Sequence, residues 1–116
     1  MIEFDDLRNG MEVWFCDARI SGSGKKLSCS LKPAKYIVED FVPDKSNYVK
    51  ITDAKNKWNY YTVSKYNYGS IEGGAVYATE RECKEAWNRI LQNILDCLQS
   101  TYEKNRNNIL NKFYKI

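Results

Sequence analysis

The sequence predicts an α+β fold in which an antiparallel β-sheet or small barrel precedes a long C-terminal α-helix. Short β-type runs recur about every ten residues over 1–78, with turn residues between them, a spacing typical of antiparallel sheets and barrels. After Thr79 the apolar residues change to a helical spacing. The 116 residues suit a single domain, with a β-rich part over 1–78 and a helical part over 79–116.

The β-rich part is expected to form about five to six strands. They cover residues 11–20, 27–31, 36–42, 48–52 and 58–66, with a short β-compatible run at 75–77. Residues 36–42 form the strongest run, because they are dense in β-branched and aromatic side chains. Pro33 marks a strand start or an edge, since proline cannot donate to a strand ladder.

A capping box predicts the start of the helix at Thr79. The Thr79 hydroxyl can accept from the backbone N–H of Glu82, and the Glu82 carboxylate can reach back to the N–H of Thr79. The apolar residues that follow line one helical stripe: Cys83, Trp87, Ile90, Leu91, Ile94, Leu98 and Tyr102. This stripe also offers a seam for a homodimer.

Two alternatives stay open for the end of the chain, because no Gly or Pro lies beyond residue 74 to stop the helix. One is a single helix of more than about thirty residues, and the other is a helix that breaks near Asn105–Asn108. We favour the break, because so long a helix is rare in globular proteins and asparagine is a poor helix former.

The amino-acid composition excludes more classes of function than any sequence motif does. The chain contains no histidine, which excludes Ser-His-Asp and Cys-His catalysis and histidine zinc ligands. No other catalytic constellation is visible, so we expect a non-enzymatic protein without catalytic residues, a metal site or a cofactor. Its four cysteines form no C-x-x-C pair and are expected to be small buried hydrophobes, although Cys16 and Cys29 can meet across a hairpin.

Two further features concern location and charge. No apolar run is long enough to span a bilayer and the acidic start does not resemble a signal peptide, so we expect a cytoplasmic protein without membrane contact. The net charge of +3 is unevenly spread: residues 1–17 carry five acids and one base, and residues 18–69 carry ten bases and four acids. Such asymmetry indicates either a binding face or an ordinary solvated surface.

The passage Trp58–Gly69 carries the candidate binding residues. In an extended chain Tyr61 and Val63 share one face, which we expect to face the core. The other face carries four aromatic side chains and two hydroxyls: Trp58, Tyr60, Thr62, Ser64, Tyr66 and Tyr68. This face can pack under the helix, which we favour, or contact a protein partner, or stack nucleic-acid bases beside nearby lysines. The candidate residues are Trp58, Tyr60, Lys65, Tyr66 and Tyr68, with Lys25 and Lys26 from the Gly-Ser-Gly-Lys loop.

Two short passages resemble known families. Phe4–Trp14 resembles the first strand of SH3-like barrels of the KOW and Tudor type, and Val76–Cys83 is similar to the strand-to-helix junction of small accessory proteins of tailed phages. The resemblance implies an SH3-like barrel, encoded by a phage or mobile element, that inhibits a host defence protein by protein–protein contact in the host cytoplasm. The alternative is a barrel that binds nucleic acid or sequesters a signalling nucleotide.

Overall fold

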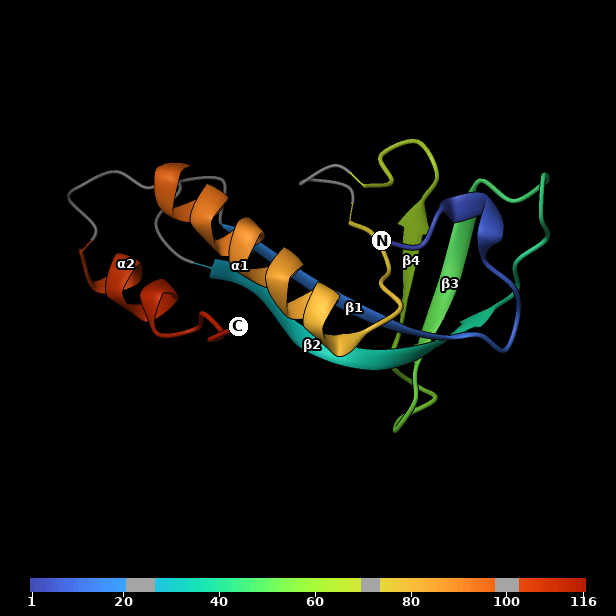
Figure 1. Ribbon diagram of the computed structural model, residues 1–116, viewed down its shortest axis with the longest axis horizontal. Coiled ribbons are helices and arrows are strands. Elements are labelled where there is room, and N and C mark those ends of the chain that lie inside the picture. The colour runs from blue at the N-terminus through green and yellow to red at the C-terminus, as the bar shows by residue number, and fades with distance from the viewer. Residues whose placement is uncertain (21–26, 70–73, 98–102) are drawn as a thin grey trace.

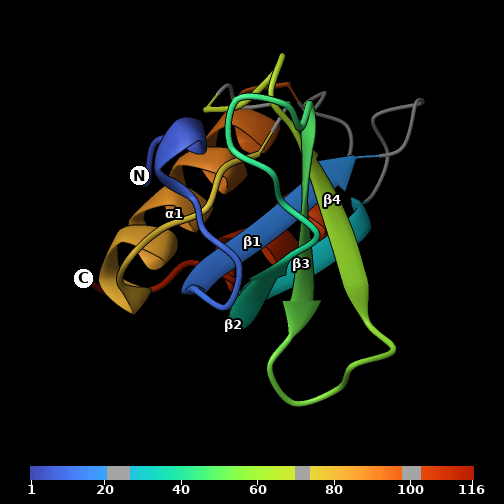
Figure 2. The ribbon, with the colours of Figure 1, turned by 90° about the vertical axis from the view of Figure 1, so that its right-hand side faces the viewer.

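The chain has the predicted α+β fold (Figure 1). The computed structural model describes residues 1–20, 27–69, 74–97 and 103–116. A four-stranded antiparallel sheet comes first, and helices follow it. Figure 2 shows the sheet curled so that β3 and β4 cross over β1 and β2, like half of a barrel.

The strands follow one another in the sheet in chain order. They are β1 (Glu12–Ile20), β2 (Leu27–Glu39), β3 (Tyr48–Asp53) and β4 (Tyr60–Ser64). The described residues therefore contain four strands rather than the predicted five to six. The count is lower because the runs at 27–31 and 36–42 join into β2, and because 75–77 contributes only an isolated bridge between Tyr77 and Trp14.

Pro33 lies inside β2 rather than at a strand start, and a bulge explains this. The register between β1 and β2 passes from Phe15–Ala34 to Asp17–Leu31, so the two residues Lys32 and Pro33 lie opposite the single residue Cys16. An extra residue in a bulge is left out of the ladder, so the missing N–H of proline costs no strand hydrogen bond there.

The sheet separates two hydrophobic cores. The first fills the inside of the curled sheet and includes Phe4 and Leu7 from the N-terminal segment, where the short helix η1 spans Phe4–Asp6. The second lies on the opposite face of β1, where Cys16 and Ala18 meet the helices. β1 is thus apolar on both faces, as expected for a strand that is covered on both sides.

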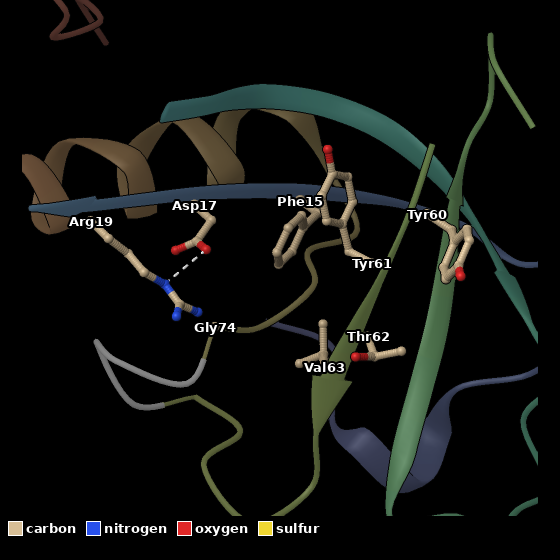
Figure 3. Close-up of a pocket in the computed structure, with 8 residues that line it drawn as sticks. All are labelled: Phe15, Asp17, Arg19, Tyr60, Tyr61, Thr62, Val63 and Gly74. Carbon is tan, nitrogen blue, oxygen red and sulfur yellow. Dashed lines mark hydrogen bonds and ion pairs between the residues drawn. The ribbon is translucent and has the colours of Figure 1, made fainter. Parts of the chain in front are cut away.

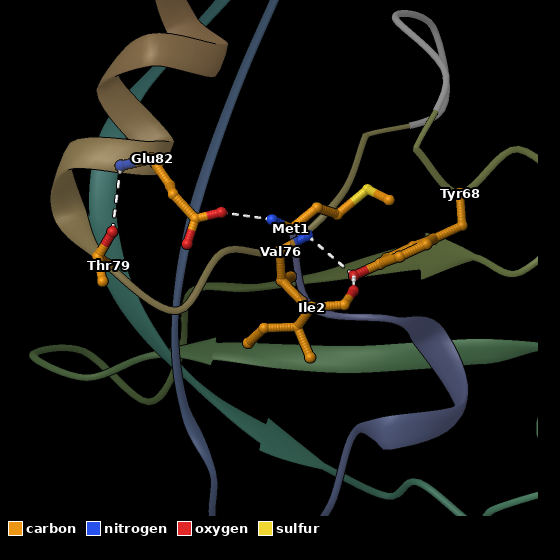
Figure 4. A network of polar contacts seen from close by, with 6 residues as sticks. All are labelled: Met1, Ile2, Tyr68, Val76, Thr79 and Glu82. Atoms are coloured by element: carbon orange, nitrogen blue, oxygen red, sulfur yellow. Dashed lines mark hydrogen bonds and ion pairs between the residues drawn. The ribbon is translucent and has the colours of Figure 1, made fainter.

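Helix α1 (Glu80–Cys97) begins where the capping box predicts. The Thr79 Oγ1 accepts from the Glu82 N–H at 3.2 Å, and the Glu82 carboxylate pairs with the Met1 ammonium instead of the Thr79 N–H (Figure 4). The described members of the predicted stripe are buried or half-buried against β1 and the C-terminal segment. They therefore face the chain's own core, and a homodimer through this stripe stays a prediction; Leu98 and Tyr102 lie outside the described residues.

The chain reverses direction after α1, so the single long helix is wrong. The Trp87 Nε1 donates to the Lys112 carbonyl at 2.9 Å, while Asn88 exchanges two hydrogen bonds with the backbone of Tyr114. The predicted break at Asn105–Asn108 is also misplaced, because these residues lie within α2 (Glu103–Leu110). Residues 98–102, between the two helices, lie outside the described chain.

Candidate binding surface

Four exposed aromatic side chains lie on or beside β3 and β4, and together they form what we call the aromatic surface. Trp58 is 90% exposed, Tyr66 75%, and Tyr60 and Tyr48 57% each. The sequence identified the first three, and Tyr48 was missed. The alternation of β3, with Val49 buried beside it, is the signal that could have found it.

The alternation of β4 decides which of its side chains face the solvent. Val63 is buried and Tyr61 packs against the first core, which confirms the predicted core face. Tyr60 and Thr62 point to the other face and are exposed. The favoured interpretation, that this face packs under the helix, is wrong because α1 covers β1 and β2 (Figure 1).

Short polar turns position the two most exposed aromatic residues. Before β4, the Asp53 carboxylate accepts from the Lys55 N–H at 2.8 Å, and the Asn56 side-chain oxygen accepts from the Trp58 N–H at 3.1 Å. After β4, the Ser64 hydroxyl accepts from the Tyr66 N–H at 3.2 Å. Asp, Asn and Ser favour turns through such hydrogen bonds, so the backbone that carries Trp58 and Tyr66 is locally fixed.

Tyr68, the fourth predicted aromatic residue, turns inward and does not belong to the aromatic surface. Its hydroxyl donates to the Ile2 carbonyl and accepts from the Val76 N–H at 3.3 Å (Figure 4). Its ring meets Phe4 edge to face at 5.5 Å. Burial raises the pKa of Tyr68 to about 12. The predicted alternation fails here because β4 ends at Ser64 and the chain turns before it reaches Tyr68.

Of the three predicted lysines, only Lys65 lies within the described residues. The Lys65 Nζ lies 3.9 Å from the Asp5 carboxylate. Lys25 and Lys26 lie outside the described residues. Lys50, which was not predicted, also borders the aromatic surface, and its Nζ lies 4.7 Å from the centre of the Tyr60 ring. No sequence pattern distinguishes Lys50 from the other seventeen basic residues.

Acidic neighbours offset the charge of Lys50. Its Nζ lies 3.9 Å from the Glu39 carboxylate and 3.7 Å from that of Asp40. Glu39 also accepts a hydrogen bond from the buried Thr52 hydroxyl at 3.1 Å. Lys50, which borders the aromatic surface, is therefore a cation held between two carboxylates.

A groove of about 340 Å³ runs beside β4 (Figure 3). Tyr60, Tyr61, Thr62 and Val63 line one side. Phe15, Asp17 and Arg19 of β1 line the other, with Gly74 at its border. The Arg19 Nε pairs with the Asp17 carboxylate at 3.2 Å, so the groove has a polar end and an aromatic end.

Cys16 and Cys83 form the one buried thiol pair that the described side chains show. Both are free and buried in the second core, and the Cys16 thiol donates to the Cys83 carbonyl oxygen at 3.6 Å. The hydrogen bond from Cys16, together with burial, raises the pKa of the Cys83 thiol far above its usual range. In the β1–β2 register Cys29 pairs with Arg19, so it does not face Cys16 as the sequence suggested.

Neither metal ligands nor membrane-spanning helices of the described residues, nor similarity to known proteins, assign a further role to this surface. Within the described ranges no three His, Cys, Asp or Glu side chains are grouped so that they could hold a metal ion. Among these residues, no helix has the length and apolarity needed to cross a membrane. Protein-family models, curated proteins and solved structures were compared with the chain, and none matches it.

Proposed function

We propose that this protein is a non-enzymatic binding protein that contacts a protein partner through the aromatic surface. The main support for this proposal is the exposure of Trp58, which is 90% accessible to solvent. Tyrosine and tryptophan dominate the centres of protein interfaces, because they bury a large area with few rotatable bonds. Four such side chains along one short strand pair favour a binding role over a purely structural one.

The local rigidity of the aromatic surface supports this proposal. Trp58 and Tyr66 flank β4, and their backbone N–H groups donate to the side-chain oxygens of Asn56 and Ser64, which holds the turns that carry them. Binding costs less conformational entropy when the contacting backbone is already ordered. The surface can therefore engage a partner without first reorganising its backbone.

The charges favour a protein partner over the alternative, a nucleic acid or a signalling nucleotide. Two lysines near the aromatic surface, Lys50 and Lys65, lie beside carboxylates and so offer less net charge to phosphates, whereas Lys55 and Lys57 have no ion pair among the described residues. Nucleic-acid binding would depend on such charges and would weaken steeply with salt. A mobility shift with DNA or RNA at about 50 mM salt, or nucleotide absorbance in the purified protein, would favour the alternative.

The resemblance to tailed-phage accessory proteins extends the proposal to the kind of partner. It implies a host protein in the cytoplasm, bound and inhibited by an SH3-like barrel. The curled sheet is compatible with part of such a barrel. The proposal of a non-enzymatic role rests on the absence of histidine from the sequence.

A pull-down with matched variants tests the function. The wild-type protein should capture a stoichiometric partner from host lysate, and the double variant Trp58→Ala, Tyr66→Ala should lose it. The control is Leu110→Ala, Ile116→Ala, which removes two exposed hydrophobic side chains from the C-terminal region and should retain the partner. Equal recovery by all three proteins would show that the aromatic surface does not mediate binding.

A further inference from the structure

The groove beside β4 runs along an edge of the sheet. Four consecutive residues of β4, from Tyr60 to Val63, line it. Neighbouring side chains of a strand point to opposite faces, so a single groove can touch all four only along the edge of the strand. β4 is the last strand of the sheet, and Figure 3 shows its edge facing Phe15 and Asp17 of β1.

The hydrogen bonds at both ends of β4 fix the direction of its backbone groups. The Asp53 N–H donates to the Asn59 carbonyl at 2.8 Å, and the Lys65 N–H donates to the Asn47 carbonyl at 2.8 Å. Between these two pairs, β3 and β4 keep one register without a bulge. Bonded and non-bonded pairs alternate in an antiparallel ladder, so every second residue of β4 bonds to β3.

The remaining residues of β4 direct their backbone groups toward the groove. Tyr61 and Val63 belong to the bonded set, which leaves the N–H and C=O groups of Tyr60, Thr62 and Ser64 on the outer edge. Among the described residues, no backbone hydrogen bond reaches these outer groups. Such a row of unpaired donors and acceptors is a template for another strand.

β4 lacks the features by which proteins usually protect a sheet edge. Its sequence Tyr-Tyr-Thr-Val-Ser contains no proline, lysine or other charged residue. The inner wall of the groove is apolar, because the Phe15 and Tyr61 rings stack at 6.2 Å beside the buried Val63. An added strand would therefore find backbone partners along the edge and an apolar surface for alternate side chains.

We propose that β4 binds an extended segment of the partner protein as an added strand, through the backbone groups of Tyr60, Thr62 and Ser64. This inference rests on the proposed function and specifies its partner as a peptide segment with apolar residues at alternate positions. Those residues pack on Phe15 and Tyr61, and Tyr60 of the aromatic surface points to the opposite face of the same strand. Main-chain hydrogen bonds supply affinity in such complexes, and the side-chain pockets supply selectivity.

A backbone substitution at Thr62 tests the added strand. Peptides selected from a random linear library against the wild-type protein are titrated against Thr62→Pro, which removes an outer N–H but keeps the bonds of Tyr61 and Val63 to β3. Affinity should fall about tenfold, as expected when a buried backbone group loses its partner. The matched control, Thr62→Val, keeps the N–H and should bind within about twofold of the wild type.

Hydrogen exchange on the wild-type protein gives an independent readout, should the proline variant fail to fold. The amides of Thr62 and Ser64 should exchange quickly in the free protein and slowly with a selected peptide bound, while those of Tyr61 and Val63 stay protected throughout. Unchanged exchange at Thr62 and Ser64, or a library that yields no binding peptide, would overturn strand addition. A partner captured through Trp58 and Tyr66 without that protection would leave the proposed function standing and remove this inference alone.

Discussion

Trp58 and Tyr68 show how a single residue's role depends on where its strand ends. Both belong to the aromatic passage of the sequence, yet Trp58 is almost fully exposed and Tyr68 is half-buried. The difference arises because β4 stops at Ser64 and the following turn directs Tyr68 toward Ile2 and Val76. Sequence alternation predicted the face of Tyr60 correctly, but it could not predict the end of the strand.

The Tyr68 hydroxyl links the N-terminal segment to the chain before α1, so Tyr68→Phe should destabilise the fold. Without the hydroxyl, the Ile2 carbonyl and the Val76 N–H lose a half-buried partner. We expect a loss of about 1–3 kcal/mol in the free energy of unfolding, measured by urea titration. The control, Tyr66→Phe, removes an exposed hydroxyl and should change it by less than about 0.5 kcal/mol.

The same variant should alter the stability at alkaline pH. Burial raises the pKa of both Tyr36 and Tyr68 to about 12 in the folded protein, whereas tyrosine in an unfolded chain ionises near pH 10. Between these values the folded state binds more protons than the unfolded state, so stability is complete below about pH 10 and falls as the pH rises toward 12. Tyr68→Phe should show a shallower fall, and an identical pH dependence would contradict this burial.

At the scale of elements, local signals predicted the structure well wherever they were sufficient. The capping box located the start of α1, and the apolar stripe identified its buried face. Local signals failed where the structure depends on contacts between residues that are far apart in the sequence. The Glu82 carboxylate is occupied by Met1, and a bulge opposite Cys16 admits Pro33 into β2. Neither partner lies near its counterpart in the sequence.

The turn back after α1 is another long-range effect, and Asn88 is one of the residues that hold the returning segment. Its side-chain amide donates to the Tyr114 carbonyl at 2.8 Å and accepts from the Tyr114 N–H at 2.9 Å. These hydrogen bonds hold the returning C-terminal segment against α1, although the sequence marks no turn there with glycine or proline. The asparagines at 105–108 suggested a break there because of their low helix propensity, but packing against α1 overrides so weak a preference.

Asn88→Ala should therefore loosen the C-terminal segment. Both hydrogen bonds to Tyr114 are lost, and we expect a destabilisation of about 1–3 kcal/mol with faster tryptic cleavage after Lys112. Asn93→Ala is the control, since Asn93 is exposed on the same helix and alanine is the better helix former. Equal cleavage rates in the two variants would show that Asn88 does not hold this segment.

At the scale of the whole molecule, the position of the helices decides which strands remain exposed to solvent. The helices and the C-terminal segment cover one face of β1 and β2, while β3 and β4 extend beyond that cover (Figure 2). The aromatic surface lies on this uncovered part, and so does the edge of β4 to which no described backbone group bonds. The sequence identified the aromatic passage, but its exposure depends on which strands the helix covers, and tertiary packing alone determines that.

Site-specific photocrosslinking in host cells tests the binding role of the aromatic surface most directly. A photoreactive phenylalanine analogue replaces Tyr60 or Tyr66 in one set of proteins and the exposed Leu110 in the control. We predict one discrete crosslinked protein from positions 60 and 66, and none from position 110. Crosslinks that are absent from 60 and 66, or that are the same from all three positions, would contradict the proposal that this surface binds a protein partner.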